Sequence, residues 1–286
     1  MTQTLLSFGH GYSAQALERL LLPHDWRIIG TTRSEAKLPA LMARGVEPRL
    51  WPGADMEHAL NAATHVLISA APDTGTDPVL AELHAQIAAR AGQFVWVGYL
   101  STTGVYGDHG GDWVDESTAL TPATTRGQAR VAAEAAWQAI PDLPLHIFRL
   151  AGIYGPGRGP FEKVRNGTAR RIIKPGQVFS RTHVADIARV LAASMARPNP
   201  GAIYNVCDDD PAPPQDVIGY AATLLGLPVP PAVDYDAADM SPMARSFYAE
   251  SKKVRNDRIK EELGVELLFP DYRSGLRALL SQDGGA

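Results

Sequence analysis

Two glycines and an alanine near the N-terminus have the spacing of a phosphate-binding turn. They form a G-x-G-x-x-A pattern directly after the apolar run at residues 5–8. The first glycine permits a tight turn, the second lets the backbone approach a pyrophosphate, and the small third residue lets a helix pack closely. An incidental glycine-rich turn is the alternative, but strand, turn, helix and second strand all fall within about 30 residues. The predicted dinucleotide contacts are Gly9, Gly11, Tyr12, Ser13 and Ala14.

A cation follows the second apolar run, at residues 27–32. Where an NAD site carries a carboxylate for the ribose 2′-hydroxyl, this chain has Thr32, Arg33 and Ser34. A planar guanidinium suits the 2′-phosphate of NADP, and the two hydroxyls add donors. The sequence therefore favours NADP over NAD as cofactor. The alternative is a solvated arginine that opens the next helix.

A parallel sheet is needed to position these residues. Short apolar runs alternate with helix-like segments, which is typical of βαβ units. The sequence predicts an α/β fold built on a doubly wound parallel Rossmann sheet. The expected strands are residues 5–8, 27–32, 48–51, 65–70, 94–99 and 146–150, and the expected helices are 13–22, 56–63, 79–91 and 127–139.

The regular alternation fades after about residue 155. Glycine and proline then punctuate shorter pieces such as GPGRGP and DDDPAPP. We expect a dinucleotide-binding domain at residues 1–155 and a smaller C-terminal substrate lobe at 156–286. Expected helices at 183–195 and 215–225 interrupt the second region, so the chain at about 178–207 can return to the sheet.

Composition limits the classes of partner. The 286 residues carry a formal net charge of −4, so no global positive field would gather nucleic acid or anionic lipid. No window approaches 18 consecutive apolar residues, and the first residues show no basic leader. The single cysteine, Cys207, cannot form an internal disulfide. We expect a cytoplasmic protein that acts on a small molecule, without nucleic acid or membrane as partner.

Four linked motifs follow one another along the chain: LSTTGVYG at 100–107, RLAGIYGPG at 149–157, RTHVAD at 181–186 and IYNV at 203–206. Together they resemble the extended short-chain dehydrogenase/reductase family, in its NAD-dependent epimerase/dehydratase group. The resemblance covers nearly the whole chain and implies a Rossmann fold, a nicotinamide cofactor and oxidoreductase or epimerase chemistry. Family members often dimerise through a two-helix face, which makes the helix at 127–139 a candidate for a homodimer.

The resemblance assigns roles to particular residues. Thr102 occupies the position of the family's Ser or Thr, whose hydroxyl orients a substrate hydroxyl or carbonyl. Arg181, before H-V-x-D, matches an arginine that often faces a nucleotide-sugar diphosphate, and His183 completes the predicted substrate contacts. A basic solvated face is an equal alternative to this anion site. The remaining predicted cofactor contacts are Ala70, Ala71, Gly152 and Tyr154.

The chain departs from the family at its proton-transfer pair. Where the family has Tyr-x-x-x-Lys, this sequence has Arg126 and Arg130. Neutralising an arginine at pH 7 costs roughly 7 kcal/mol, so neither residue can shuttle a proton, although both can still donate hydrogen bonds. Tyr106 and His109 are the local substitutes, with a packed tyrosine and an exposed histidine as the alternative. We list Thr102, Tyr106, Arg126 and Arg130 as the catalytic candidates.

Three hypotheses about function follow. The first is an NADP-dependent oxidoreductase or epimerase-like enzyme with altered acid/base groups, acting on a nucleotide sugar or another anionic small molecule. The second is a dinucleotide sensor without turnover, which the missing tyrosine and lysine favour. The third, a structural or nucleic-acid-binding protein, fits the net charge and the glycine motif badly. No metal site is expected, since the histidines lack ligand spacing and Asp208 to Asp210 are typical of a solvated turn.

Overall fold

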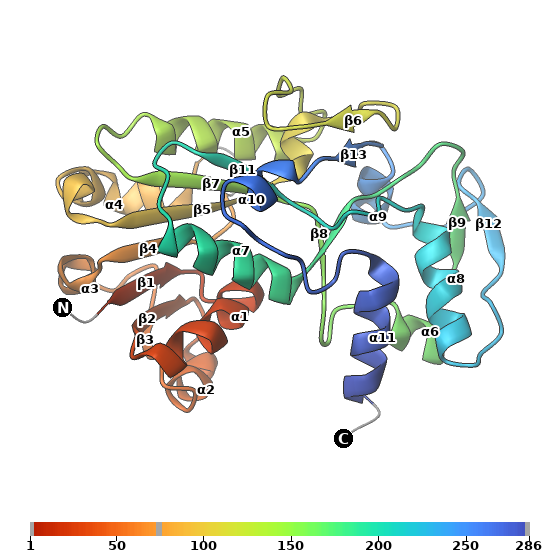
Figure 1. Ribbon diagram of the computed structural model, residues 1–286, viewed down its shortest axis with the longest axis horizontal. Helices are drawn as coiled ribbons and strands as arrows, with labels where there is room; N and C mark the ends of the chain where they lie inside the picture. Colours follow the sequence, from red (N-terminus) through yellow and green to blue (C-terminus); the bar gives the residue numbers. More distant parts are fainter. Residues whose placement is uncertain (1–2, 73–75, 284–286) are drawn as a thin grey trace.

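The centre of the structure is a parallel sheet of seven strands (Figure 1). The computed structural model describes residues 3–72 and 76–283. Within them the strand order is β11-β7-β5-β4-β1-β2-β3, and every neighbouring pair is parallel. The strands are β1 (Thr4–Phe8), β2 (Arg27–Thr32), β3 (Glu47–Leu50), β4 (His65–Ile68), β5 (Trp96–Thr102), β7 (Leu145–Leu150) and β11 (Ile203–Val206). The order reverses between β1 and β4, the point where open α/β sheets bind ligands.

Helices cover both faces of the sheet because its strands are apolar on both sides. Leu5 and Leu6 follow each other in β1 and belong to separate cores on opposite faces, as the two-residue repeat of a strand requires. Both are fully buried, and burial of such a side chain contributes about 1.5–3 kcal/mol. One face is covered by α1 (Tyr12–Leu21), α2 (Leu38–Met42) and α7 (Val184–Ala196), and the other by α3 (Glu57–Ala62), α4 (Pro78–Ala88) and α5 (Thr125–Gln138).

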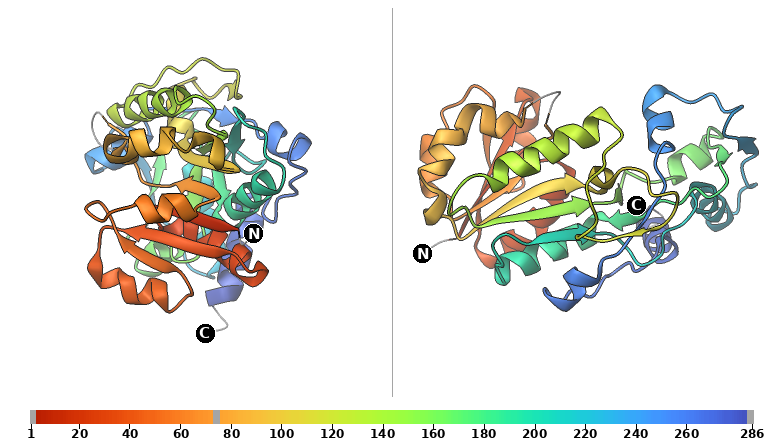
Figure 2. Two further views of the ribbon diagram at one scale, coloured as in Figure 1. Left: turned by 90° about the vertical axis from the view of Figure 1, so that its left-hand side faces the viewer. Right: turned by 90° about the horizontal axis from the view of Figure 1, so that it is seen from above.

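A smaller lobe lies beyond the carboxyl ends of the strands, where the arrowheads point in Figure 2. It has its own apolar core, to which α6 (Phe161–Arg165), α8 (Pro214–Leu224) and α11 (Tyr272–Asp283) contribute. Its strands pair in twos: β8 (Gly152–Tyr154) with β10 (Arg181–His183), β9 (Arg171–Ile173) with β12 (Ala232–Asp234), and β6 (Trp113–Val114) with β13 (Lys253–Val254). The lobe also carries α9 (Pro242–Phe247), whereas α10 (Asp257–Glu261) packs against β11 in the core of the sheet domain.

Four short 3₁₀ segments join these elements within the residues that the structure describes. They are η1 (Leu22–His24), η2 (Glu35–Lys37), η3 (Ala91–Gln93) and η4 (Thr103–Tyr106). No helix in the described part of the chain is long and apolar enough to cross a membrane.

The predicted fold class, a doubly wound parallel sheet with a smaller C-terminal lobe, is confirmed. Most predicted elements agree with the structure to within about two residues, and the main corrections concern ends. The expected strand at 94–99 begins at Trp96 and continues to Thr102, because its last residues pair with β7. The expected helix at 79–91 ends at Ala88, after which η3 takes over. His183 caps α7 instead of starting it.

Candidate functional site

The glycine-rich turn leaves room for an anion at the start of α1. Gly9 has a φ of +75°, and a Cβ there would lie 2.9 Å from the backbone nitrogen of Ala70. A Cβ at Gly11 would meet only the Gly9 carbonyl oxygen, at 3.7 Å, so the space beyond it is open. No side chain caps the helix and no acidic residue occupies its first turn. The positive end of the helix dipole therefore faces open space, which fits a pyrophosphate.

A charged cluster of the buried His10 and Glu18 with the exposed Arg44 supports this turn from behind. The Nε2 atom of His10 lies 2.8 Å from Oε2 of Glu18, and Arg44 donates from Nε to the other oxygen at 2.9 Å. Burial lowers the pKa of His10, while its hydrogen bond to Glu18 opposes the shift. A Cβ at Gly30 would lie 2.8 Å from the His10 ring, so β2 needs a glycine there. The sequence analysis missed this cluster, because its members are 8 and 26 residues apart.

Two further predicted cofactor contacts lie beside the turn. Ala70 donates its backbone N–H to Phe8 at 3.0 Å, and this bond holds the residue after β4 against the end of β1. Ala71 is exposed next to it. The structure thus brings Ala70 to within contact of Gly9, as a site spanning β1 and β4 requires.

Arg33 stands at the end of β2 with an exposed side chain. No hydrogen bond, ion pair or ring contact to another described residue involves its guanidinium. Thr32 is half-buried, and its hydroxyl accepts a hydrogen bond from the Ser34 backbone at 3.2 Å. The turn after β2 is therefore ordered by Thr32, while Arg33 is free to bind an anionic ligand.

Thr102 ends β5 at the same edge of the sheet as the glycine-rich turn. Its side chain is half-buried, and its hydroxyl oxygen accepts a hydrogen bond from the Gly104 backbone at 3.2 Å. This bond caps η4 and fixes the hydroxyl at the strand end. The hydroxyl hydrogen remains available to a substrate oxygen.

Tyr106, another catalytic candidate, is fully buried. Its hydroxyl donates to Oδ1 of Asn205 at 2.8 Å and accepts from Nη1 of Arg149 at 3.0 Å. Arg149 pairs with the buried Glu134 at 2.8 Å, and Ser101 donates to the same carboxylate. Burial raises the pKa of Tyr106 to about 12. This geometry corresponds to the alternative of a packed structural tyrosine.

The two arginines at the family's tyrosine and lysine positions are engaged in different contacts. Arg130 donates to the Leu100 carbonyl at 2.7 Å and to the Tyr99 hydroxyl at 3.1 Å, so it is fastened to β5. Arg126 is exposed near the start of α5, and its guanidinium carbon lies 5.9 Å from the centre of the Phe247 ring in α9. Arg126 thus connects the sheet domain to the second lobe.

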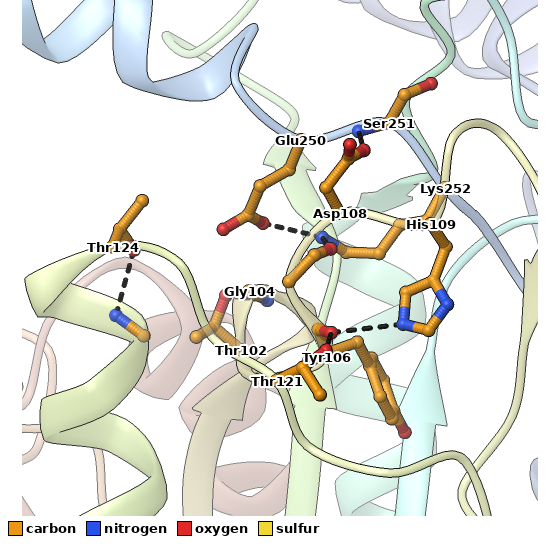
Figure 3. Close-up of polar contacts among 12 residues, drawn as sticks. Thr102, Gly104, Tyr106, Asp108, His109, Thr121, Thr124, Glu250, Ser251 and Lys252 are labelled. Carbon is orange, nitrogen blue, oxygen red and sulfur yellow. Dashed lines mark hydrogen bonds and ion pairs between the residues drawn. The ribbon is translucent and has the colours of Figure 1, made fainter.

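A segment of the second lobe lies over the loop that follows Thr102 (Figure 3). The Ser251 backbone donates to Oδ1 of Asp108 at 2.7 Å. Lys252 donates from Nζ to Oε2 of Glu250 at 2.6 Å. His109 is half-buried, and its Nε2 lies 3.1 Å from the Tyr106 carbonyl oxygen. The sequence analysis missed Glu250 and Lys252, which are about 150 residues away from Thr102 and belong to no family motif.

The predicted substrate contacts lie in the interior. Arg181 donates from Nη1 to the carbonyls of Phe179 and Ala212, at 2.8 and 2.9 Å. His183 accepts a hydrogen bond from the Ala185 backbone through Nδ1 and caps α7. Burial lowers the pKa of His183 to about 4, so the ring is neutral at pH 7. In this arrangement both side chains stabilise the fold around β10.

The last two predicted cofactor contacts, Gly152 and Tyr154, lie in different environments. Gly152 is exposed, whereas the Tyr154 side chain packs in the core of the second lobe, with its ring 5.1 Å from that of His183. The loop that follows β8 does reach the glycine-rich turn: the Tyr12 hydroxyl donates to the Pro156 carbonyl at 3.0 Å. The guanidinium of Arg158 lies 5.7 Å from the centre of the Tyr12 ring. This exposed cation was not predicted.

The turn at residues 208–210 has one buried member. Asp208 is buried, and neither of its carboxylate oxygens has a hydrogen-bond partner among the described residues. Burial raises its pKa to about 8, and the Arg181 charge opposes the shift. Asp209 and Asp210 pair instead with Lys260 and Arg273 at the surface. No three His, Cys, Asp or Glu side chains gather as a metal site in residues 3–72 and 76–283.

The architecture and its motifs define a class of protein. A Methylobacillus flagellatus protein assigned to the NAD-dependent epimerases/dehydratases superposes with a TM-score of 0.71 at 25% identity, covering 99% of both chains. The human epimerase family protein SDR39U1, solved with NADPH, superposes with a TM-score of 0.73 at 15% identity over 98% of this chain and 99% of that one. The chain thus has the fold of these epimerase/dehydratase-type proteins, and its motifs resemble those of the extended short-chain dehydrogenase/reductase family.

Two other proteins are similar to this chain over nearly its full length. A functionally unknown conserved protein from Silicibacter pomeroyi DSS is 69% identical and superposes with a TM-score of 0.96, covering 98% of this chain and 99% of that one. Protein YeeZ from Escherichia coli (strain K12) is 27% identical over 277 residues, which are 92% of this chain and 95% of YeeZ. No protein-family model matches the chain. Neither similar protein carries a reaction in its name, so the chemistry must be argued from the site.

Proposed function

We propose that this chain binds a nicotinamide dinucleotide along the carboxyl edge of its sheet. The observation that carries the proposal is the open space at Gly11, which lies at the uncapped start of α1. Side chains at Gly9 or Gly30 would collide with neighbours, so the turn is shaped to expose backbone. The neighbours described as NAD-dependent or solved with NADPH support the same cofactor class.

The proposed cofactor is NADP. Arg33 supports this choice, because it is exposed at the end of β2 and engages no other described residue. A guanidinium binds a phosphate through two parallel hydrogen bonds, and no acidic side chain follows β2 directly to bind a ribose 2′-hydroxyl. Calorimetric titration with NADPH and NADH tests this: NADPH should bind at least about tenfold more tightly. Equal affinities would contradict the choice of NADP.

The proposed activity is that of an epimerase/dehydratase-type oxidoreductase. The cofactor, when bound, supplies the hydride chemistry. Thr102 donates its hydroxyl hydrogen to a substrate oxygen and orients it at the end of β5. Arg126 and Arg158 are exposed cations near this edge, which favours an anionic small molecule such as a nucleotide sugar. Arg130 holds the β5 end in place through the Leu100 carbonyl.

A dinucleotide sensor without turnover is the second candidate. Two observations favour it: Arg130 is tied to β5, and the Tyr106 hydroxyl is engaged in the core. Deuterium transfer from [4-²H]NADPH to nucleotide sugars and simple aldehydes separates the two functions. If the protein is an enzyme, it should transfer the label to at least one of these compounds. If it is a sensor, it should bind NADPH and transfer no label.

We also propose a homodimer through α5 in a reducing, cytoplasmic setting. The exposed face of α5 carries Ala132, Ala135 and Ala136, which are small enough for close helix packing. The only cysteine of the chain, Cys207, is buried and forms no disulfide. Light scattering should give the mass of a dimer, and Ala135→Glu should convert it to a monomer.

A further inference from the structure

The chain segment at residues 248–252 is held firmly against the Thr102 loop. Lys174 and Gln177 donate to the backbone carbonyls of Tyr248 and Glu250, the second at 2.6 Å. The Ser251 carbonyl accepts the backbone N–H groups of His109 and Gly111, at 3.1 and 2.9 Å. These bonds join both sides of the segment to the sheet domain and the second lobe. Side chains on it are therefore fixed with respect to β5.

Lys252 is hydrogen-bonded to the end of the turn that Thr102 caps. Its side chain is 10% exposed, and Nζ donates to the Gly107 carbonyl at 2.5 Å and to Glu250 at 2.6 Å. Gly107 closes the short turn that Thr102 caps. An ammonium has three N–H bonds, so two are satisfied by these acceptors and one remains for another partner.

One of the two carboxylate oxygens of Glu250 lacks a hydrogen-bond donor among the described residues. Its side chain is 11% exposed, one carboxylate oxygen accepts from Lys252, and the other oxygen is buried without a partner among the described residues. A buried carboxylate oxygen without a donor is costly, which points to a group that arrives from outside the chain. Figure 3 shows Glu250 and Lys252 extending from their segment toward the side of the site where Thr102 and Thr124 lie.

We propose that Lys252 and Glu250 are the proton-transfer residues of this site, in place of the family's tyrosine and lysine. This inference rests on the proposed function. Unlike Arg126 and Arg130, a lysine ammonium can release its proton. The hydroxyl of Tyr106 is already engaged in the core, and the His109 ring donates to a carbonyl. The other charges at the segment, Asp108 and Lys174, bind its backbone.

The step balances for the reduction of a carbonyl group. A reduced nicotinamide held at the glycine-rich turn would supply a hydride to the carbonyl carbon and would itself be oxidised, while the π electron pair of the C=O bond moves to the oxygen. That oxygen takes a proton from Lys252: an N–H bond breaks, its electron pair stays on nitrogen, and an O–H bond forms. Solvent then returns a proton to the amine through the Glu250 carboxylate. Thr102 holds the oxygen by a hydrogen bond throughout.

Chemical labelling tests the position of Lys252 without turnover. The full chain is treated with acetic anhydride, with and without saturating NADPH, and acetylation is measured at each lysine by mass spectrometry. If Lys252 faces the reacting end of the cofactor, NADPH should slow its acetylation at least fivefold. Acetylation of Lys253, which lies over the Trp113 ring, should not change. Equal protection of both lysines, or of neither, overturns the inference.

Kinetics with 9,10-phenanthrenequinone as carbonyl probe test the proton transfer. Lys252→Arg keeps the charge and the hydrogen bonds to Gly107 and Glu250 but cannot release a proton, so we expect kcat to fall at least a hundredfold. Glu250→Gln should lower kcat at least tenfold and change the pH profile. Both variants should keep the wild-type melting temperature and bind NADPH within twofold of wild type. Lys253→Arg is the matched control and should keep wild-type kcat.

These experiments distinguish a failure of the proposed function from a failure of the inference about Lys252 and Glu250. If wild type binds no NADPH in calorimetry, the proposed function is wrong and the inference is wrong with it. If wild type reduces the probe and Lys252→Arg keeps its kcat and pH profile, the inference alone is overturned. If wild type binds NADPH and does not reduce the probe, the labelling result decides.

Discussion

The glycine-rich turn and the end of β5 lie at one edge of the same sheet, yet they differ in how their functional groups are engaged. At the turn, the groups suited to a dinucleotide are open: Gly11 faces empty space and Arg33 engages no other described residue. At the end of β5, Arg130 and Tyr106 are already hydrogen-bonded within the protein. Cofactor binding and proton transfer can therefore change independently in this fold.

The difference has a physical origin in what each region must supply. The turn binds through backbone N–H groups and a helix dipole, which depend on the path of the chain and on few side-chain types. Proton transfer needs one side chain with a labile proton at one place. Replacing a tyrosine and a lysine with arginines removes that side chain and leaves the helix start untouched. A second segment can then supply the proton, as we propose for residues 250–252.

The largest expected effect is the loss of cofactor binding in Gly11→Val. Gly11 has a φ of −99°, and a Cβ there contacts nothing closer than 3.7 Å, so valine is tolerated by the fold but fills the pyrophosphate space. We expect the Kd for NADPH to rise at least about a thousandfold, or roughly 4 kcal/mol. Calorimetry measures the Kd, and the melting temperature should stay near that of wild type.

Gly92→Val is the matched control for this change, because a Cβ at Gly92 also meets open space. It lies in η3, far from the carboxyl edge, and should keep the wild-type Kd. If Gly11→Val still gains thermal stability from added NADPH, the turn is not the pyrophosphate site.

The second effect concerns turnover of nucleotide sugars. A positioned acid/base group contributes about 10² to 10⁴ in rate, and the proposed Lys252 reaches the site from a different segment than the family's tyrosine. Wild type should therefore act on UDP-galactose at least about a hundredfold more slowly than a family enzyme with Tyr-x-x-x-Lys. The double variant Arg126→Tyr with Arg130→Lys should bind NADPH within threefold of wild type, because neither residue belongs to the turn. Epimerisation of UDP-galactose, followed by chromatography, measures the rate. If wild type epimerises UDP-galactose as fast as a family enzyme with Tyr-x-x-x-Lys, proton transfer at the end of β5 is intact. The contrast between the two regions would then be wrong.

Much of the binding region could be predicted from the sequence. Local features define it: a strand, a turn and a helix within residues 4–21, with glycines at the positions where a side chain would collide. The predicted residues Gly9, Gly11 and Ala70 meet in the structure for this reason. The His10–Glu18–Arg44 cluster that supports them was not predicted, because the burial of His10 and Glu18 is decided by tertiary packing and leaves no periodic pattern.

The second region could be predicted only in part. Thr102 lies at the strand end where its motif placed it. Glu250 and Lys252 could not be found, since a contact between segments about 150 residues apart depends on how the second lobe returns to the sheet. Arg181 and His183 show the reverse relation between motif and structure. Their motif is present in the sequence, and in the structure both side chains form hydrogen bonds with backbone groups.

A third effect, on stability, would sharpen the contrast at the end of β5. Tyr106→Phe removes the hydroxyl that joins Arg149 to Asn205 in the interior. Both partners remain buried, so we expect a loss of about 1–3 kcal/mol in the free energy of unfolding, with unchanged affinity for NADPH. Urea denaturation measures the loss. The control Tyr220→Phe removes a more exposed hydroxyl, bonded to Arg277, and should cost less than about 0.5 kcal/mol.

The smallest expected effect is on cofactor choice at Arg33. Arg33→Ala removes the exposed guanidinium proposed to bind the 2′-phosphate, so the Kd for NADPH should rise about tenfold, or about 1.4 kcal/mol, while the Kd for NADH stays constant. Because both partners are charged and exposed, the difference should shrink as salt rises. Lys37→Ala removes another exposed cation, in η2, and should change neither Kd by more than about twofold. A preference for NADPH that survives Arg33→Ala at low salt would mean that a different cation, such as Arg158, binds the phosphate and that the end of β2 plays no part in the choice.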